Sequence, residues 1–220
     1  MQPATAAMWA KQDQHEGDRW RLFGAVGAAI DATTVLYPDS YVDIAPSFVF
    51  ESVTYVDVDK RTPRFFGDVD GVAEIIGRHG GPTHADVRFL HADYTAGLDL
   101  PDQHFDLLIS LYGGFVSEHC TRHLRVGGTL LVNPSHGDAA LASIDDRYEL
   151  AGVVISRDGD YRVSSKDLDA YLVPTKPQAI SAEILHRTRR GVAYTKPAFA
   201  YLFARVRSSA AATERLASSG

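Results

Sequence analysis

The segment 33–59 constrains the fold of this chain more than any other part of its sequence. Residues 33–36 are β-branched or aliphatic, as in a buried strand, and Pro38 ends this run because proline has no amide proton for a β-ladder. Residues 45–51 can form a short helix, and residues 53–58 form a second apolar run. Two strands joined by a helix make a βαβ unit, in which the strands are parallel and the crossover is right-handed.

This βαβ unit also predicts where a ligand would bind. In open parallel sheets, ligands bind beyond the carboxyl ends of the strands, close to the first loop that leads from strand to helix. Residues 37–41 and Asp57 lie at those ends in the sequence, so we expect them to face one common mouth. The rest of the chain is expected to extend the sheet and to cover that mouth.

Length and composition fit one globular domain and argue against several classes of protein. The 220 residues are 45% hydrophobic and 23% charged, which allows a substantial buried core. A net charge of −6 gives no electrostatic reason to expect a nucleic-acid or membrane partner. The single cysteine, Cys120, excludes an internal disulfide. No apolar run reaches about 18 residues, and residues 1–14 lack the pattern of a signal peptide, so we expect a cytoplasmic protein.

Apolar periodicity predicts the remaining elements of the chain. Helices are predicted at 16–30, 68–78, 116–124 and 138–144, with strands at 85–91, 106–111, 129–133, 148–156 and 199–206. We expect a single domain over 16–207, with loosely ordered residues at 1–15 and 208–220. Residues 157–197 form a long insertion between the last two strands, interpreted either as a cap near the mouth or as a surface excursion.

Three segments of the predicted sheet resemble one known family. They are VTYVDVDK at 53–60, LHADYTAGLDLPDQHFDLLISL at 90–111 and LRVGGTLLVN at 124–133. Together with the order of a helix, five strand–helix units and two final strands, they resemble the class I S-adenosylmethionine-dependent methyltransferases over roughly residues 16–156 and the last strand. The resemblance implies an α/β, Rossmann-like class I methyltransferase fold. Its sheet would be mostly parallel and seven-stranded, with helices on both faces and the insertion between the last two strands.

The resemblance also implies S-adenosylmethionine as the cofactor and methyl transfer to a small-molecule acceptor. Asp57 would accept the ribose hydroxyls, and Asp93 would accept the adenine amino group, with Tyr94 beside the ring. The cofactor-binding residues that it implies are Tyr37, Asp39, Ser40, Asp57, Val58, Asp93, Tyr94 and Ser110. For Asp57 and Asp93, a cap of the following turn is the alternative interpretation.

The first loop departs from the family pattern. In the family this loop is glycine-rich, because the backbone must approach the cofactor closely, whereas residues 37–43 contain no glycine. The departure supports a second hypothesis: a methyltransferase-like module without catalytic activity, which binds a metabolite or a partner protein. A dinucleotide dehydrogenase is disfavoured, because no G-x-G-x-x-G follows the first strand.

Two residues after the fourth and fifth strands are candidates for the chemistry. Tyr112 is the first candidate for orienting a substrate at the strand end. His136 is a candidate base, because an imidazole exchanges protons near neutral pH. Asn133, which ends the fifth strand, is a candidate for substrate binding. Packing within a loop for Tyr112, and solvation for His136, are the alternative interpretations.

The basic run in the insertion and a histidine pair complete the candidates. Arg187 and Arg190, with Arg189 between them, could clamp a carboxylate or phosphate of a substrate in bidentate fashion, or form a solvated patch. His119 and His123 share one face of a predicted helix. Because no third ligand and no H-E-x-x-H pattern accompany them, we expect no metal site there.

Overall fold

The computed structural model describes residues 1–176 and 180–208, and its centre is one eight-stranded sheet. The strands are β1 (Thr34–Pro38), β2 (Ser52–Asp57), β3 (Asp86–His91), β4 (Phe105–Ser110), β5 (Leu124–Val132), β6 (Tyr148–Arg157), β7 (Asp160–Ser164) and β8 (Ala200–Arg205). Their order across the sheet is β3-β2-β1-β4-β5-β8-β6-β7. Strands β1 to β5 are parallel, and β8 runs antiparallel to both β5 and β6.

This order confirms the predicted Rossmann-like, mostly parallel sheet. The predicted count of seven strands is wrong, because β7 is an eighth strand at the β6 edge. It forms a hairpin with β6 through Asp158 and Gly159, whose φ angles of 53° and 83° suit a two-residue turn. An Asp-Gly pair between two runs that favour strands is the sequence signal for such a hairpin.

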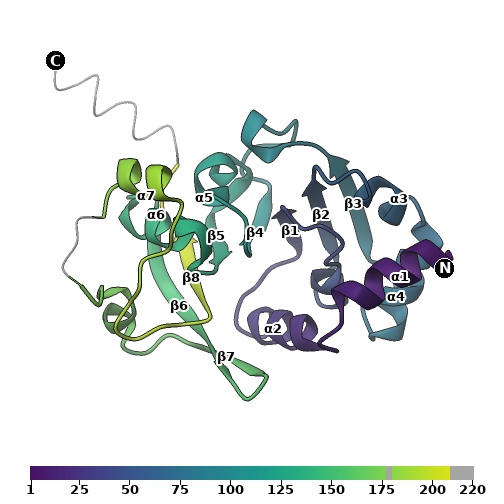
Figure 1. The fold of residues 1–220 in the computed structure, drawn as a ribbon, viewed down its shortest axis with the longest axis horizontal. Helices are drawn as coiled ribbons and strands as arrows, with labels where there is room; N and C mark the ends of the chain where they lie inside the picture. The colour runs from purple at the N-terminus through teal and green to yellow at the C-terminus, as the bar shows by residue number, and fades with distance from the viewer. Residues whose placement is uncertain (177–179, 209–220) are drawn as a thin grey trace.

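Seven α-helices and five 3-10 helices surround the sheet in the described residues. The α-helices are α1 (Pro3–Gln12), α2 (Asp18–Gly27), α3 (Thr62–Phe66), α4 (Val69–Arg78), α5 (Val116–His119), α6 (Asp138–Ile144) and α7 (Ala182–Thr188). The 3-10 helices are η1 (Ala45–Phe48), η2 (Tyr94–Ala96), η3 (Thr121–His123), η4 (Ser135–Gly137) and η5 (Leu168–Leu172). In Figure 1, α1, α3 and α4 gather at the β3 end of the sheet, and α5, α6 and α7 gather near β5 and β8.

Alternation along β1 explains how one sheet separates two layers. Val35 belongs to a buried cluster that includes Phe23 of α2, whereas Leu36 belongs to a second cluster that includes Ala139 of α6. Because successive strand residues point to opposite faces, both faces of the sheet are covered, as predicted. No helix in the described part of the chain is long and apolar enough to cross a membrane.

The amino-terminal segment is more ordered than its polar composition predicts. Residues 3–12 form α1, which packs against α3 and α4. Its Trp9 ring meets Phe48 edge-on at a centroid distance of 5.6 Å, and the Gln2 amide donates to Asp68 at 2.6 Å. The expectation of a loosely ordered segment 1–15 is therefore wrong, because contacts with residues far along the chain hold a helix that local sequence alone would leave marginal.

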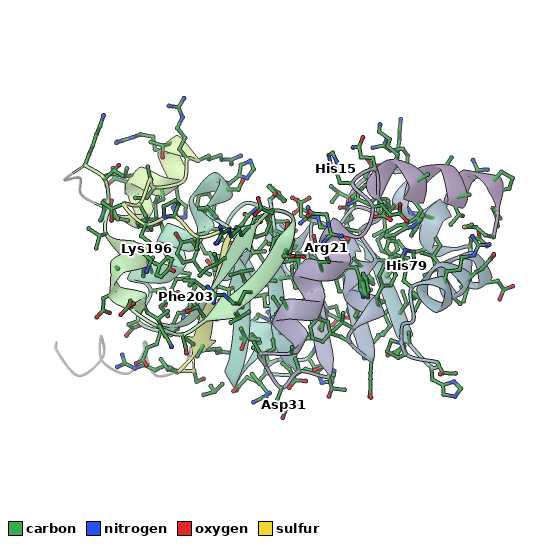
Figure 2. The ribbon with its side chains drawn as sticks, turned by 90° about the horizontal axis from the view of Figure 1, so that it is seen from below. His15, Arg21, Asp31, His79, Lys196 and Phe203 are labelled. Atoms are coloured by element: carbon green, nitrogen blue, oxygen red, sulfur yellow. The ribbon has the colours of Figure 1, made fainter. Side chains whose placement is uncertain are left out.

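The hairpin of β6 and β7 folds back onto α2. Arg21 Nε donates to the Gly159 carbonyl at 2.7 Å, and the Tyr161 hydroxyl donates to Asp18 at 2.9 Å. Figure 2 shows Arg21 on α2 beside the strands of this region. These contacts join α2, which precedes β1 in the chain, to the start of the insertion.

The rest of the insertion packs on the α5–α6 face of the sheet. Tyr171 of η5 and Leu185 of α7 are 4% and 2% exposed, and both belong to the buried cluster on that face. The insertion is therefore part of the core in its described residues, rather than a surface excursion. Residues 177–179, and residues 209–220 of the expected tail, lie outside the described residues.

Asp106 ties the amino ends of β1 and β4 together. Its carboxylate accepts from the Thr33 and Thr34 amides at 3.0 and 2.9 Å, and it pairs with Arg125 Nε at 2.5 Å. Burial by itself would raise the pKa of Asp106, but the bonds from Thr34, Arg125 and Thr33 outweigh burial and lower this pKa to about 2.

Asp106 should therefore make stability depend on pH. Its folded-state pKa lies below the unfolded value of about 3.9, so ionised Asp106 stabilises the fold above about pH 4 and loses that contribution as pH falls to about 2. We expect Asp106→Asn to lower the free energy of unfolding at pH 7 by about 1–2 kcal/mol and to flatten its dependence on pH between 4 and 2. Urea denaturation across this range measures both, with exposed Asp70→Asn as the control. Parallel pH curves for Asp106→Asn and the wild type would contradict this role.

Candidate functional site

The loop after β1 makes a tight turn without a glycine. Asp39 and Tyr41 occupy its left-handed positions, with φ angles of 57° and 48°, which glycine adopts most easily. The Tyr41 amide donates to Asp57 Oδ2 at 2.6 Å, and the Asp59 amide donates to Asp57 Oδ1 at 2.7 Å. The carboxylate at the end of β2 therefore holds the loop in place, and an aspartate supplies a conformation that a glycine would otherwise provide.

Two residues expected at the mouth are buried in this loop. Tyr37 and Ser40 are only 2% and 3% exposed. The Tyr37 hydroxyl donates to buried Asp43 at 3.2 Å, and burial beside Asp43 raises the pKa of Tyr37 well above its usual value. Tyr37 lies in the same cluster as Val35, because the two alternate onto one face of β1, so it points into the core on the α2 side.

The last residue of β2 and the residue after it differ sharply in exposure. Asp57 is 6% exposed, whereas the next residue, Val58, is 60% exposed. The Val58 carbonyl is bound by His91 Nε2 at 3.0 Å, which links the ends of β2 and β3. An apolar side chain so exposed, beside a carboxylate, is a surface on which a ring could stack.

Asp93 and Tyr94 have different roles at the end of β3. Asp93 Oδ1 accepts from the Thr95 amide at 2.8 Å and the Thr95 hydroxyl at 2.7 Å, and these bonds lower the pKa of Asp93. This is the cap that the sequence allowed as its alternative role. The Tyr94 hydroxyl donates to the Gly114 carbonyl at 2.8 Å, and burial raises the pKa of Tyr94 to about 12. Tyr94 thus joins the loop after β3 to the loop after β4.

Ser110, at the end of β4, serves a buried carboxylate. Its hydroxyl donates to Asp138, which is 0% exposed and also accepts from the amide and hydroxyl of Ser117. Burial raises the pKa of Asp138, although the bonds from Ser110 and Ser117 act in the opposite direction. Ser110 is 1% exposed and does not line the cavity described next, so its assignment to a cofactor has no support in the geometry.

A cavity of about 270 Å³ lies at the carboxyl edge of the sheet, where the parallel fold predicts a site. Its walls come from the loops after β1, β3, β4 and β5, from α5, and from the residue that follows α7. The lining residues are Asp39, Tyr94, Thr95, Tyr112, Gly114, Phe115, His119, His136 and Arg189. The structure therefore brings together Asp39, Tyr94, Tyr112 and His136, which the sequence singled out separately.

Tyr112 is held at the cavity by its backbone and by a neighbouring arginine. Its amide donates to Asn133 Oδ1 at 3.2 Å, and its ring lies 5.1 Å from the Arg19 guanidinium carbon. Tyr112 is 48% exposed, so its ring is available to a ligand, whereas Asn133 is 4% exposed. Asn133, predicted to bind substrate, therefore positions the Tyr112 loop and does not line the cavity.

His136 reaches the cavity from a strained turn. Its φ of 55° is left-handed, and its Nδ1 lies 2.6 Å from the Ser135 hydroxyl. Among the described residues, Nε2 of this ring has no hydrogen-bond partner. A cavity-lining histidine with one ring nitrogen engaged and the other without a partner can serve as a candidate base for a ligand.

The three arginines of the basic run separate in space. Arg189 lines the cavity, at the left-handed position that ends α7, with φ of 48°. Arg187 is exposed and lies 3.9 Å from Glu183 on the same helix, and Arg190 lies against a different hollow beside α7. The predicted substrate residues Arg187 and Arg190 are therefore away from this cavity, because a helix turn sends successive side chains in different directions.

Three further residues of the site had no clear signal in the sequence. His119, noted in the sequence only as one of a histidine pair, lines the cavity, with its ring 6.0 Å from the Tyr94 ring. Asp138 follows a loop and resembles any helix-start acid, and Arg19 is one of many surface-type residues in α2. Arg19 Nη1 is buried without a hydrogen-bond partner in the described chain. Within the same residues, no three His, Cys, Asp or Glu side chains form a group that could hold a metal ion.

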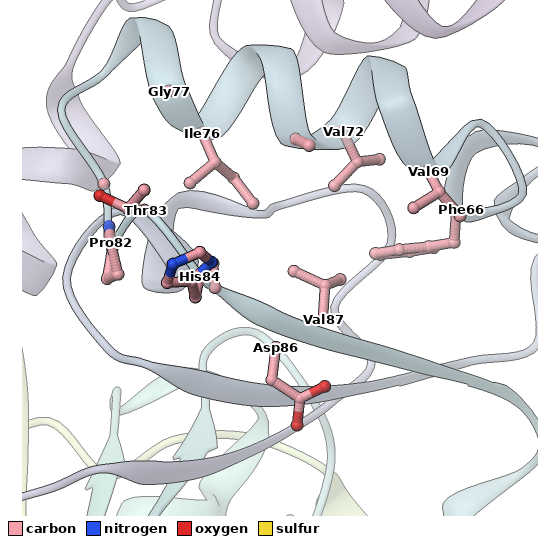
Figure 3. Close-up of a pocket in the computed structure, with 13 residues that line it drawn as sticks. Phe66, Val69, Val72, Ile76, Gly77, Pro82, Thr83, His84, Asp86 and Val87 are labelled. Atoms are coloured by element: carbon pink, nitrogen blue, oxygen red, sulfur yellow. The ribbon is translucent and has the colours of Figure 1, made fainter.

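A larger groove, of about 690 Å³, lies elsewhere, between α4 and β3. Figure 3 shows Val72 and Ile76 of α4 facing Val87 of β3 across it. Its lining is mainly aliphatic, with His84 and Asp86 as the titratable members, and it lies toward the amino end of β3. Ligand sites of parallel sheets lie at the opposite edge, so we assign the functional site to the smaller cavity.

Comparisons with known proteins give weak structural likenesses. Neither protein family models nor curated proteins match this chain. Among solved structures, a putative methyltransferase from Bacillus halodurans is similar over 56% of this chain, with 18% identity and a TM-score of 0.39, and the match spans about half (55%) of that protein. A Corynebacterium glutamicum protein covers 76% of this chain and 90% of its own length, at 12% identity and a TM-score of 0.49. The O-methyltransferase TomG from Streptomyces achromogenes was solved in complex with S-adenosylmethionine. Its match covers 74% of this chain and 87% of TomG, at 12% identity and a TM-score of 0.44.

With TM-scores below 0.5, these likenesses carry no argument about the activity. The chain's own strand order carries the fold assignment, because five parallel strands are followed by β8, which runs antiparallel to them, and then by β6. The protein therefore has a Rossmann-like, class I methyltransferase-like fold, with one additional edge strand.

The left-handed position of Asp39 leads to a stability prediction. An L-residue there costs about 1 kcal/mol relative to glycine, and aspartate reduces that cost through local hydrogen bonding. We expect Asp39→Ala to be about 1 kcal/mol less stable than Asp39→Gly, because both remove the carboxylate but only glycine suits φ of 57°. Chemical denaturation of the two variants measures the difference. Equal stability, or a more stable alanine variant, would contradict the observed loop conformation.

Proposed function

We propose that this chain binds S-adenosylmethionine at the carboxyl edge of its sheet and transfers the methyl group to a small-molecule acceptor. The observation that supports this most is the position of Asp57, the last residue of β2, and of Asp93, two residues after β3, at the same edge of the sheet as a cavity with polar and aromatic walls. Ribose hydroxyls and an adenine amino group are donors that two such carboxylates accept.

The groups at the end of β2 fit an adenosine. Each Asp57 oxygen accepts one backbone amide, and a carboxylate oxygen has two lone pairs, so each retains capacity for one ribose hydroxyl. Val58, at 60% exposure, offers an apolar surface to the adenine ring. Both residues are fixed by the bonds that join the ends of β1, β2 and β3, so little ordering would be needed on binding.

The groups at β3 and β1 fit the remaining parts of this ligand. Asp93 Oδ2 makes no hydrogen bond within the described chain, so it can accept the adenine amino group while Oδ1 caps the turn. Asp39 lines the cavity and suits the ligand's ammonium group. Burial, then the nearby Asp57 charge, raises the pKa of Asp39, which a bound cation would oppose.

The chain would contribute mainly position to the reaction. When bound, S-adenosylmethionine supplies an electrophilic methyl group. Tyr112, held by Asn133 and exposed at the end of β4, would orient the acceptor, and such positioning supplies much of the rate in methyl transfer. His136, with Nδ1 engaged by Ser135, would take the acceptor's proton at Nε2.

A module without catalytic activity is the second candidate, and one observation favours it. The Tyr94 hydroxyl is bound to both the carbonyl and the amide of Gly114, at 2.8 and 3.2 Å, which closes the space between the loops after β3 and β4. The cavity of about 270 Å³ also lies just below the range of about 300–1,000 Å³ that ligand sites have. A bound metabolite smaller than S-adenosylmethionine would need no opening of these loops.

Calorimetric titration with S-adenosylmethionine and S-adenosylhomocysteine separates the two candidates. We expect dissociation constants in the micromolar range, about −8 kcal/mol. Asp57→Ala and Asp93→Ala should each weaken binding at least about ten-fold, the loss of one good hydrogen-bonded contact. Tyr94→Phe, which frees the Gly114 loop, should retain binding or strengthen it.

Asp99→Asn is the matched control, because Asp99 is an exposed acid on the same stretch of chain that does not line the cavity. Thermal melting of each variant establishes that it is folded. No heat and no thermal stabilisation at millimolar concentration of either ligand would overturn the methyltransferase proposal in favour of the module.

A further inference from the structure

Arg189 places a positive charge at the cavity without a protein counter-charge. In the described chain, no carboxylate lies within 4 Å of its guanidinium. Other arginines do have such a partner, as Arg187 has Glu183. Asp39 is the acid that shares the cavity lining, on the loop after β1. An unpaired guanidinium at the rim of a cavity has all five N–H donors available to a ligand.

The backbone holds Arg189 where it is. The Arg189 amide donates to the Leu185 carbonyl at 2.8 Å, closing the last turn of α7, and Leu185 is buried. Two residues later, Gly191 lies so close to the loop after β5 that a Cβ there would stand 2.0 Å from the Pro134 carbonyl oxygen. Only glycine permits this approach, so the chain after α7 is pressed against the loop that carries His136.

Side-chain contacts fix α7 over α5 as well. His186 Nε2 lies 2.7 Å from Glu118 Oε2, and the His186 ring meets the Phe115 ring edge-on at 4.8 Å. Phe115 itself lines the cavity. The backbone that carries Arg189 therefore belongs to a docked segment and not to a free loop.

The other groups that face the cavity favour an acid beside a ring. Tyr94, Tyr112 and Phe115 supply aromatic surface, and His119 supplies an imidazole, to the lining. A carboxylate accepts two parallel N–H bonds from one guanidinium, a geometry that a neutral amide cannot match. A cavity of about 270 Å³ has room for a single-ring molecule.

We propose that Arg189 binds the carboxylate of the methyl acceptor, so that the acceptor is a small aromatic acid. The identification of the bound acid as the methyl acceptor rests on the proposed function. The binding of an acid by Arg189 rests on the cavity alone. It makes Arg189 a residue that determines specificity, and it gives the insertion between β6 and β8 the role of supplying it.

Paired probes test the inference without any measurement of methyl transfer. Calorimetry with 4-hydroxybenzoate and with 4-hydroxybenzamide compares two molecules of one shape, of which one is an anion. We expect the wild type to bind the acid at least about ten-fold more tightly than the amide, as expected for a charge-assisted pair. Arg189→Gln should abolish this preference, and Arg189→Lys should retain part of it, because lysine keeps the charge but loses the bidentate geometry.

Arg157→Gln is the control variant, because it removes the same charge from an exposed arginine that does not line the cavity. It should keep the full preference for the acid. Gly191→Ala gives a second approach, since it leaves every charge in place but displaces the segment that carries Arg189, and it should reduce the preference. Equal affinity of the wild type for acid and amide, or an unchanged preference in Arg189→Gln, would overturn the inference.

The outcomes remain separable from the proposed function. Binding of S-adenosylhomocysteine without preference for the acid would be consistent with methyl transfer and would contradict the proposed role of Arg189. Preference for the acid without binding of either cofactor form would support the anion site and would assign it to a module without catalytic activity.

Discussion

The buried carboxylate of Asp138 is the interaction on which the site depends. A charge removed from water is costly unless donors surround it, and Asp138 meets this demand by accepting from Ser110 at the end of β4 and from Ser117 at the start of α5. Because Asp138 begins α6 after the loop of β5, its bonds fix two neighbouring strand ends and two helices relative to one another. The cavity-lining loops after β4 and β5 begin at these two strand ends.

The same device recurs along the carboxyl edge of the sheet. Asp57 accepts backbone amides from the loop after β1 and from its own loop, and Asp93 accepts the amide of Thr95. Each acid therefore has a structural role whether or not it binds a ligand. A carboxylate that already holds its loop is also pre-positioned for a ligand, because its rotamer is fixed before binding. In this fold, capping the turn and binding the ligand are thus compatible interpretations of one residue.

The insertion completes the mouth that the five parallel strands begin. Four loops of the sheet supply aromatic, imidazole and carboxyl groups, but the arginine of the lining, Arg189, comes from the segment after α7. Its attachment uses a buried leucine, a histidine–glutamate contact and the close approach of Gly191 to Pro134. The loops at this edge supply the binding groups, while the strands and the buried part of the insertion hold them in place.

Apolar patterning and the placement of acids along the chain were enough to predict the parallel sheet and the edge of it where a ligand site lies. Apolar runs such as 106–111 are buried on both faces and cannot avoid a central position, and the acids Asp57 and Asp93 lie at the carboxyl ends of strands that meet at one edge. The β6–β7 hairpin also has a local sequence signal, because Asp158-Gly159 favours a two-residue turn.

Tertiary structure alone decided which polar residues face the cavity. Tyr37 lies inside because alternation along β1 turns it toward α2, and Ser110 lies inside because it serves Asp138. Arg189, rather than Arg187 or Arg190, reaches the cavity, because a left-handed residue at the end of α7 and the packing of Gly191 set its direction. Such choices depend on contacts between residues far apart in the chain, which no local pattern of residue types encodes.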